Sequence, residues 1–268
     1  MVVAVSVVLA GCGGGGGDGD GDGEPTVTTA GATTIPVLTT VGAAAGPATE
    51  LTLRITDVRL VNSEESDNGV RILLPAGVAS ASVTVTGLPS PNRVVSVCQA
   101  RELDRRQSGA ACRMPANGEA ATVALGSAAT GVEIVQVGVA GAGPEANSLP
   151  LEEVVVRYAA SSREVSARLA QIAGGEAGGR PTFAMSPAGA SGAYRAKLSW
   201  TSIPVFGGTP SSAQVELLRD GTAAQTQAAG AEVQISGNAS PPGGNLAIRI
   251  QNTGTSALVS PKVELLLP

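Results

Sequence analysis

The chain has 268 residues, an apolar fraction of 43%, an aromatic fraction of 2% and a net charge of -5. The acidic balance argues against a nucleic-acid partner, because phosphate binding requires a concentrated basic surface. Histidine is absent, which excludes Ser-His and Cys-His nucleophilic catalysis as well as zinc or copper sites with histidine ligands. The length suffices for one large or two modest domains.

An apolar run of about ten residues opens the chain. It is too short for a membrane-spanning helix, which takes roughly 17 to 25 residues, but it fits the apolar core of a signal peptide. The run ends in Leu9-Ala10-Gly11-Cys12, which resembles the lipobox of bacterial lipoproteins. The resemblance implies that residues 1–11 are a signal peptide and that Cys12 carries the lipid. The mature protein would then be anchored on the extracytoplasmic side of a membrane of the bacterial cell envelope. The alternative interpretation is a buried strand followed by an unrelated cysteine.

Residues 12–48 are predicted to be a flexible tether rich in glycine, aspartate, threonine and alanine. Such a composition cannot bury enough apolar surface to offset the entropy of ordering the chain. Within it, Asp18, Asp20 and Asp22 alternate with glycines, as in the first half of a calcium-binding loop. The twelfth position of that loop holds Thr29 instead of a bidentate acid, so an acidic spacer is favoured over a weak calcium site.

The first folded region is predicted over residues 49–173. Apolar and polar residues alternate from Leu51 to Thr56, with the period of two that is typical of a half-buried strand. Further strands are predicted at 70–74, 78–86, 93–99, 120–125, 132–139, 151–158 and 164–169. The last of these could instead be one or two helical turns. Turn clusters separate the short strands, which favours an antiparallel β-sandwich.

A glycine-rich linker at 174–180 leads into a second predicted β-sandwich domain over 181–268. Its strands are predicted at 194–201, 214–219, 232–235, 245–251 and 262–267, with a tight hairpin turn at Asp220-Gly221. This order, with Ala-Ile-Arg-Ile-Gln-Asn-Thr-Gly at 247–254, resembles the small sandwich modules of bacterial secreted proteins, including pre-peptidase C-terminal and immunoglobulin-like domains. The resemblance implies an accessory domain that binds, spaces or stabilises. The predicted fold is therefore all-β, with two antiparallel β-sandwich domains behind the signal peptide and tether.

Cys98 and Cys112 remain once Cys12 is assigned to the lipid. Outside the cytoplasm these two residues are expected to form a disulfide, and the alternative is two free buried thiols. The loop between them could offer guanidinium groups to an acidic glycan or another anionic polymer. The arginines concerned are Arg101, Arg105 and Arg106 within the loop and Arg113 just outside it. The competing interpretation is a solvated loop whose charges pair locally.

Tyr194 and Trp200 share the apolar face of their predicted strand, which favours core packing over an exposed platform for sugar stacking.

A carboxylate-dependent hydrolase would need two acids that converge in a cleft. Glu152 and Glu153 are adjacent on a strand and face opposite sides, which counts against them as a catalytic pair.

The sequence thus predicts a lipid-anchored envelope protein with a non-enzymatic binding or structural role. Binding of a glycan or an anionic polymer by the arginine loop is one alternative, and a carboxylate-dependent hydrolase is an alternative of another class. Besides the membrane, a surface glycan or a protein is the expected partner. Neither a nucleic acid nor a cofactor is expected.

Overall fold

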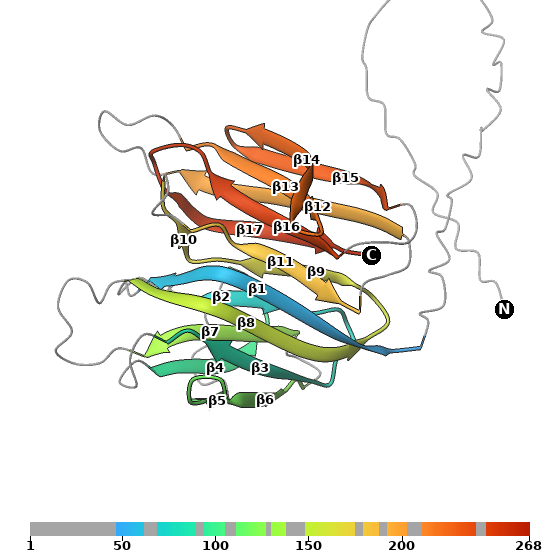
Figure 1. Cartoon of the computed structure of the whole chain (residues 1–268). Helices are drawn as coiled ribbons and strands as arrows, with labels where there is room; N and C mark the ends of the chain where they lie inside the picture. The colour runs from blue at the N-terminus through green and yellow to red at the C-terminus, as the bar shows by residue number, and fades with distance from the viewer. Residues whose placement is uncertain are drawn as a thin grey trace, which may run out of the picture. The chain divides into compact units, whose positions relative to one another are not determined.

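The computed structural model describes residues 47–61, 69–88, 94–104, 111–126, 130–137, 148–174, 179–187, 192–202, 211–239 and 245–268. Within these ranges the chain forms strands and no helix, and therefore none that could cross a membrane (Figure 1). The all-β prediction is confirmed. The predicted leader, the lipidation residue Cys12 and the acidic repeat of Asp18, Asp20 and Asp22 lie outside the described residues.

The strands form two antiparallel sheets that pack together as a β-sandwich. Sheet A has the order β14 (Thr222–Ala229), β13 (Ala213–Arg219), β16 (Leu246–Asn252), β11 (Thr182–Ser186), β1 (Thr49–Val61), β8 (Ser148–Ala160), β3 (Ser80–Thr86) and β6 (Ala120–Ala124). Sheet B has the order β15 (Glu232–Ala239), β12 (Gly192–Ser202), β17 (Leu258–Leu266), β9 (Glu164–Arg168), β2 (Val70–Leu73), β7 (Gly131–Val137), β4 (Val94–Ala100) and β5 (Cys112–Arg113). A short strand, β10 (Gln171–Ile172), also pairs with β17.

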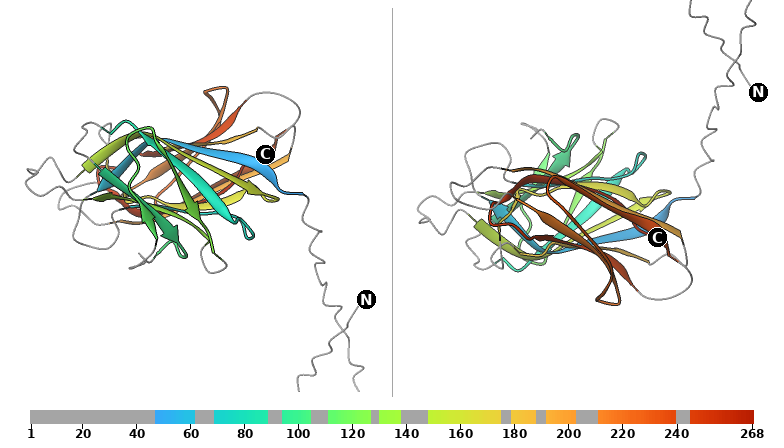
Figure 2. Two further views of the ribbon diagram at one scale, coloured as in Figure 1. Left: turned by 90° about the horizontal axis from the view of Figure 1, so that it is seen from below. Right: turned by 90° about the horizontal axis from the view of Figure 1, so that it is seen from above.

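Each sheet takes strands from both halves of the chain. In sheet A, β1 pairs with β11, and in sheet B, β9 pairs with β17. Figure 2 shows strands of the two halves side by side. The described residues belong to one compact unit with one apolar core, so the predicted linker at 174–180 does not separate two sandwiches. The alternation of apolar and polar residues locates strands along the chain but does not identify the strands with which they pair. For this reason two sandwiches were predicted where the structure has one.

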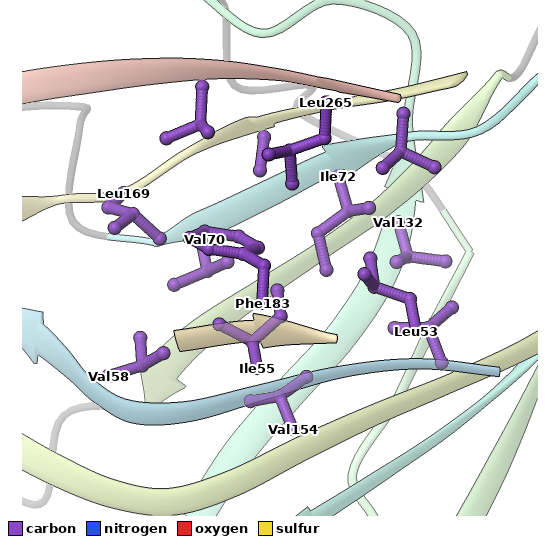
Figure 3. Packing of buried hydrophobic residues seen from close by; sticks show 14 of the residues in the cluster. Leu53, Ile55, Val58, Val70, Ile72, Val132, Val154, Leu169, Phe183 and Leu265 are labelled. Atoms are coloured by element: carbon purple, nitrogen blue, oxygen red, sulfur yellow. The ribbon is translucent and has the colours of Figure 1, made fainter. Parts of the chain in front are cut away.

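The core lies between the two sheets and consists mainly of Val, Leu and Ile. On β1 the alternation that predicted the strand places Leu51, Leu53 and Ile55 inside, each at most 1% exposed. Phe183 on β11 is fully buried and lies among core residues of both sheets (Figure 3). Each such side chain contributes roughly 1.5–3 kcal/mol through burial, so many medium-sized residues replace the aromatic cluster that this composition lacks.

The turn between β13 and β14 and the strand β9 test two local predictions. Asp220 and Gly221 have φ angles of 50° and 81°, which is the conformation of the tight turn predicted between β13 and β14. Residues 164–168 form strand β9, so the helical alternative for this segment is wrong. Strands β5, β10, β11 and β14 were not predicted from the sequence. Of these, β14 consists of Thr, Ala and Gln and has no apolar alternation to reveal it.

Strand β1 changes its buried face at Asp57. Ile55 and Val58 are both buried although they are three residues apart, and Asp57 between them has a φ of 56°. The Asp57 carboxylate accepts a hydrogen bond from the backbone N–H of Arg180. The end of the predicted linker is therefore fastened to the central strand of sheet A.

Tyr158 on β8 carries a buried hydroxyl without a hydrogen-bond partner in the described part of the chain. The side chain is 2% exposed, and this burial raises the pKa of Tyr158 to about 12, with Arg163 acting in the opposite direction. An unfolded tyrosine ionises near pH 10. The contribution of the neutral phenol to the free energy of unfolding is therefore fully present below about pH 10. It is lost as the pH rises toward 12.

Tyr158→Phe should leave the protein as stable at pH 7, or more stable by about 1 kcal/mol, because it removes an unsatisfied buried group. Its advantage over the unchanged protein should grow by about 1.4 kcal/mol between pH 7 and pH 11, since only the tyrosine form ionises on unfolding. Urea denaturation at both pH values measures this difference. An advantage that does not change with pH would contradict the buried, neutral phenol.

Candidate functional site

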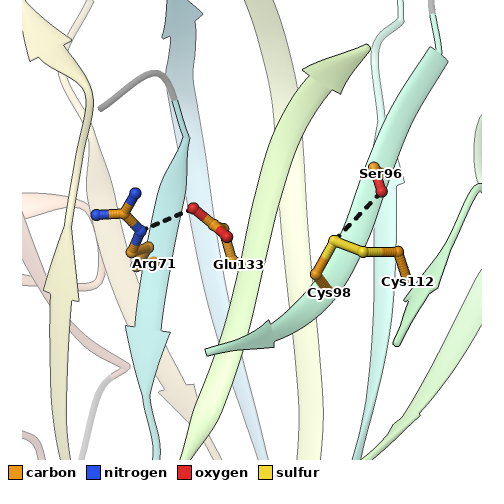
Figure 4. Close-up of a disulfide and its surroundings, with 5 residues drawn as sticks. All are labelled: Arg71, Ser96, Cys98, Cys112 and Glu133. Atoms are coloured by element: carbon orange, nitrogen blue, oxygen red, sulfur yellow. Dashed lines mark hydrogen bonds and ion pairs between the residues drawn. A yellow bond between two sulfur atoms is a disulfide. The ribbon is translucent and has the colours of Figure 1, made fainter. Parts of the chain in front are cut away.

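Cys98 and Cys112 form a disulfide between β4 and β5, where the two residues lie directly opposite each other. Cys98 is 5% exposed, whereas Cys112 lies at the surface. Ser96 Oγ lies 3.3 Å from Cys98 Sγ (Figure 4). The predicted disulfide is confirmed, and the alternative of two free thiols is wrong.

A row of polar side chains runs from the disulfide across the outer face of sheet B. Residues that pair directly across neighbouring strands lie on the same face, and the pairing registers place the row on β4, β7, β2, β9 and β17. In that order its members are Cys98, Glu133, Arg71, Arg168 and Lys262. We call these residues the polar row. Their strand neighbours Ile72, Val132 and Ile134 are fully buried between the sheets, so the row faces away from the core.

Arg71 and Glu133 form a buried ion pair at the centre of the polar row. Arg71 Nε lies 2.7 Å from Glu133 Oε1, and each side chain is 2% exposed (Figure 4). Removing two charges from water costs several kcal/mol each, and their attraction offsets this only when further hydrogen bonds satisfy the groups. Arg71 meets this condition in part, because its Nη1 donates to the backbone oxygen of Leu103 at 2.8 Å.

The first residues after β4, at 101–104, are fastened to the polar row. The Leu103 oxygen also accepts a hydrogen bond from Arg168 Nη1 at 3.3 Å. Lys262 Nζ lies 2.6 Å from the Asp104 carboxylate. Arg168 is fixed from its other side, since its Nη2 donates to Ser260 Oγ at 2.6 Å. The described start of the disulfide-closed loop is thus held on sheet B by charged side chains of distant strands.

Two of the four predicted ligand-binding arginines, Arg101 and Arg113, lie at the ends of this loop. Arg101 follows β4 and Arg113 belongs to β5, and both are exposed. The backbone oxygen of Arg101 accepts a hydrogen bond from Thr130 Oγ1 at 3.1 Å, which fixes its main chain but leaves the side chain at the surface. Arg105 and Arg106 lie outside the described residues. Local pairing occurs on the loop at Asp104, whose partner is Lys262.

Arg113 lines a shallow hollow of about 360 Å³ beside β5 and β6. Met114, Glu119 and Thr122 line it as well, and Met114 is 66% exposed. One guanidinium and one carboxylate face the same space, so the charges do not favour an anion over a neutral molecule. The hollow offers a small apolar contact beside polar groups of both signs.

The structure places Tyr194 and Trp200 against the core, as the alternation predicted. The Tyr194 hydroxyl donates to Gln225 Oε1 at 2.9 Å, and Trp200 Nε1 donates to Ser211 Oγ at 3.0 Å. Both polar groups are therefore engaged within the fold, as partly buried Tyr and Trp side chains usually are.

The two glutamates considered for a hydrolase do not converge. Glu153 pairs with Arg54 at 2.7 Å on the outer face of sheet A, while Glu152 is exposed. Within the described ranges there is no group of three or more His, Cys, Asp or Glu side chains that could hold a metal ion. Of these two acids, Glu153 is therefore a structural partner of Arg54 and Glu152 lies at the surface.

The polar row was not predicted, although the sequence contains a signal for it. Arg71 and Glu133 are single charged residues flanked by apolar ones, in Val70-Arg71-Ile72 and Val132-Glu133-Ile134. On isolated strands such residues suggest an exposed face. Only the strand register, which the sequence does not contain, brings the opposite charges together and shows that they are buried.

Comparisons with known proteins add no family. No protein-family model matches the chain, and no curated protein matches it. Among solved structures, the M60 catalytic domain with the CBM51-1 and CBM51-2 domains of Clostridium perfringens ZmpB is similar at 7% identity and a TM-score of 0.24, over 79% of this chain and 36% of that chain. BuGH86 in complex with neoagarooctaose is similar at 10% identity and a TM-score of 0.22, over 81% of this chain and 32% of that chain.

A third similar structure is that of the infectious bursal disease virus Gx strain, at 12% identity and a TM-score of 0.21, over 84% of this chain and 73% of that chain. The chain spans about a third of the length of the first two structures. At these TM-scores the similarities carry no argument about function.

Proposed function

We propose that this chain is a lipid-anchored protein of the bacterial cell envelope with a non-enzymatic binding or structural role. The observation that carries the proposal is the disulfide between Cys98 and Cys112. Thiols of cytosolic proteins are kept reduced, whereas disulfides persist outside the cytoplasm. A structural disulfide therefore supports export, which is what the lipobox-like Leu9-Ala10-Gly11-Cys12 implies.

The use of charged side chains in the fold supports a structural role. Three close ion pairs engage Arg71 with Glu133, Arg54 with Glu153, and Arg249 with Glu216. In each pair the arginine binds the carboxylate. A hydrolase of the carboxylate-dependent class would need such a group free to act as an acid, a base or a nucleophile. These acids are committed to holding strands and loops in place.

A rigid sandwich behind a long tether is suited to presenting a surface away from the membrane. The predicted tether of residues 12–48 is rich in glycine and other small residues, and such chains behave as flexible spacers. Binding of an acidic glycan or another anionic polymer through Arg101 and Arg113 stays a prediction of the sequence. Exposure of both guanidinium groups supports it.

Lipidation of Cys12 tests the proposal directly. The full chain, produced in a bacterial host that is supplied with labelled palmitate, should become labelled and sediment with the membranes. Cys12→Ala should lose the label and leave the membrane fraction, because two acyl chains are needed for stable anchoring. Cys112→Ala is the matched control, since it removes a different cysteine and should keep the label.

Mass spectrometry of the mature protein completes this test. The amino-terminal residue should be Cys12 with its acyl chains attached. Unmodified protein that retains residues 1–11, or label that persists in Cys12→Ala, would contradict the lipid anchor.

A further inference from the structure

The two cysteines of the disulfide lie in different surroundings. Cys98 is 5% exposed and belongs to β4, which lies between β5 and β7 in sheet B. Cys112 is exposed and belongs to β5, at the end of the sheet. An external thiolate exchanges with a disulfide by attacking one of its two sulfurs, and access is one of the factors that decide which one. Burial therefore favours attack at Cys112.

The direction of attack also protects Cys98. A thiolate approaches the attacked sulfur in line with the S–S bond, from the side away from the leaving sulfur. For Cys98 this side faces Glu133, its partner on β7 (Figure 4). The Glu133 side chain is 2% exposed, so protein fills this path and a carboxylate repels the incoming negative charge. For Cys112 the corresponding side faces away from β4, beyond the last strand of the sheet.

Ser96 favours Cys98 as the leaving group. The two residues are two positions apart on β4 and share a face, and Ser96 Oγ lies 3.3 Å from Cys98 Sγ. A disulfide sulfur carries no hydrogen, so the hydroxyl is the donor. Burial by itself disfavours a charged thiolate, but the hydrogen bond from Ser96 stabilises the thiolate that forms on Cys98. A sulfur that leaves as a more stable thiolate leaves faster.

We propose that Cys112 is a site of reversible thiolation by a small thiol, with Cys98 as the leaving group. The thiolate forms a bond to Cys112 Sγ while the bond between the two Sγ atoms breaks. The electron pair of the broken bond stays on Cys98 Sγ, which then takes a proton from water. One disulfide replaces another, so no oxidant or reductant is consumed. Attack by the Cys98 thiolate on Cys112 expels the small thiol again and restores the original disulfide. The reaction does not involve Cys12, so it is tested independently of the lipid anchor.

Glutathione is the probe for this reaction. The full chain with Cys12→Ala, in which Cys98 and Cys112 are the remaining cysteines, is incubated with excess reduced glutathione at about pH 8, where thiols are partly ionised. Samples are trapped with N-ethylmaleimide at successive early times and mapped by mass spectrometry. The first product should carry glutathione on Cys112 and maleimide on Cys98. In urea, which removes the difference in burial, glutathione should appear on both cysteines to a similar extent.

Ser96→Ala should slow formation of the Cys112 adduct about threefold or more, because the departing thiolate loses its hydrogen bond. Ser166→Ala is the matched control: it removes a half-buried hydroxyl from the same face of sheet B and should leave the rate unchanged. Circular dichroism checks that both variants are folded. Glutathione found first on Cys98, or a disulfide that reacts in urea but not in the folded protein, would overturn the proposal. An unchanged rate in Ser96→Ala would overturn the part assigned to Ser96.

Discussion

Glu133→Leu should lower the free energy of unfolding by about 3–5 kcal/mol. The reason lies in Arg71, whose side chain is 2% exposed and whose Nε lies 2.7 Å from Glu133 Oε1. Leucine fills the space of the carboxylate but leaves a guanidinium buried without that charge. Urea denaturation of the oxidised protein at pH 7 measures the loss.

Replacing both partners should recover most of the stability. Arg71→Met with Glu133→Leu buries no unpaired charge, and apolar replacements of buried ion pairs are often neutral or stabilising. The matched control is Glu153→Leu on sheet A, whose partner Arg54 is 49% exposed. Water can solvate that arginine, so the control should cost at most about 1 kcal/mol. Equal losses of unfolding free energy for Glu133→Leu and Glu153→Leu would show that burial does not increase the cost of breaking the pair of Arg71 and Glu133.

The strands themselves were largely predictable because their signal is local. Alternation marked β1, β3, β6 and β8, and the Asp-Gly pair marked the turn between β13 and β14. What the sequence could not supply was the pairing of distant strands. The pairing of β1 with β11 and of β9 with β17 brings together residues more than a hundred apart in one sheet and nearly so in the other, and no local pattern encodes such a partner. The division into two sandwiches followed from that gap.

The candidate site shows the same limit. The disulfide could be predicted because cysteine pairing follows from the number of cysteines and the compartment, without knowledge of the register. The polar row could not, because Arg71, Glu133 and Arg168 come from three separate strands. Their chemistry depends on burial beneath residues 101–104, which the sequence had treated as the start of a solvated loop.

Removal of the disulfide should cost about 3 kcal/mol of unfolding free energy. The loop closed by Cys98 and Cys112 spans 14 positions, and the chain-entropy model assigns roughly this value to a loop of that length. Cys98→Ala with Cys112→Ala avoids burying a hydroxyl at the position of Cys98. Cys12→Ala serves as the control and should leave the stability unchanged. A double variant as stable as the control would contradict a constraining role of the disulfide.

The disulfide and the ion pair should also depend on each other. Cys98 lies opposite Glu133, and the disulfide-closed loop begins with the residues that cover Arg71 and bind it through the Leu103 oxygen. When the loop is released, water can reach Arg71 and replace part of the lost charge interaction. Glu133→Leu should therefore cost at least about 1 kcal/mol less in the background without the disulfide than in the intact protein. Additive losses would mean that the hydrogen bonds and the ion pair of residues 101–104 hold the loop on sheet B without the disulfide. The disulfide would then stabilise the fold without controlling the burial of the polar row.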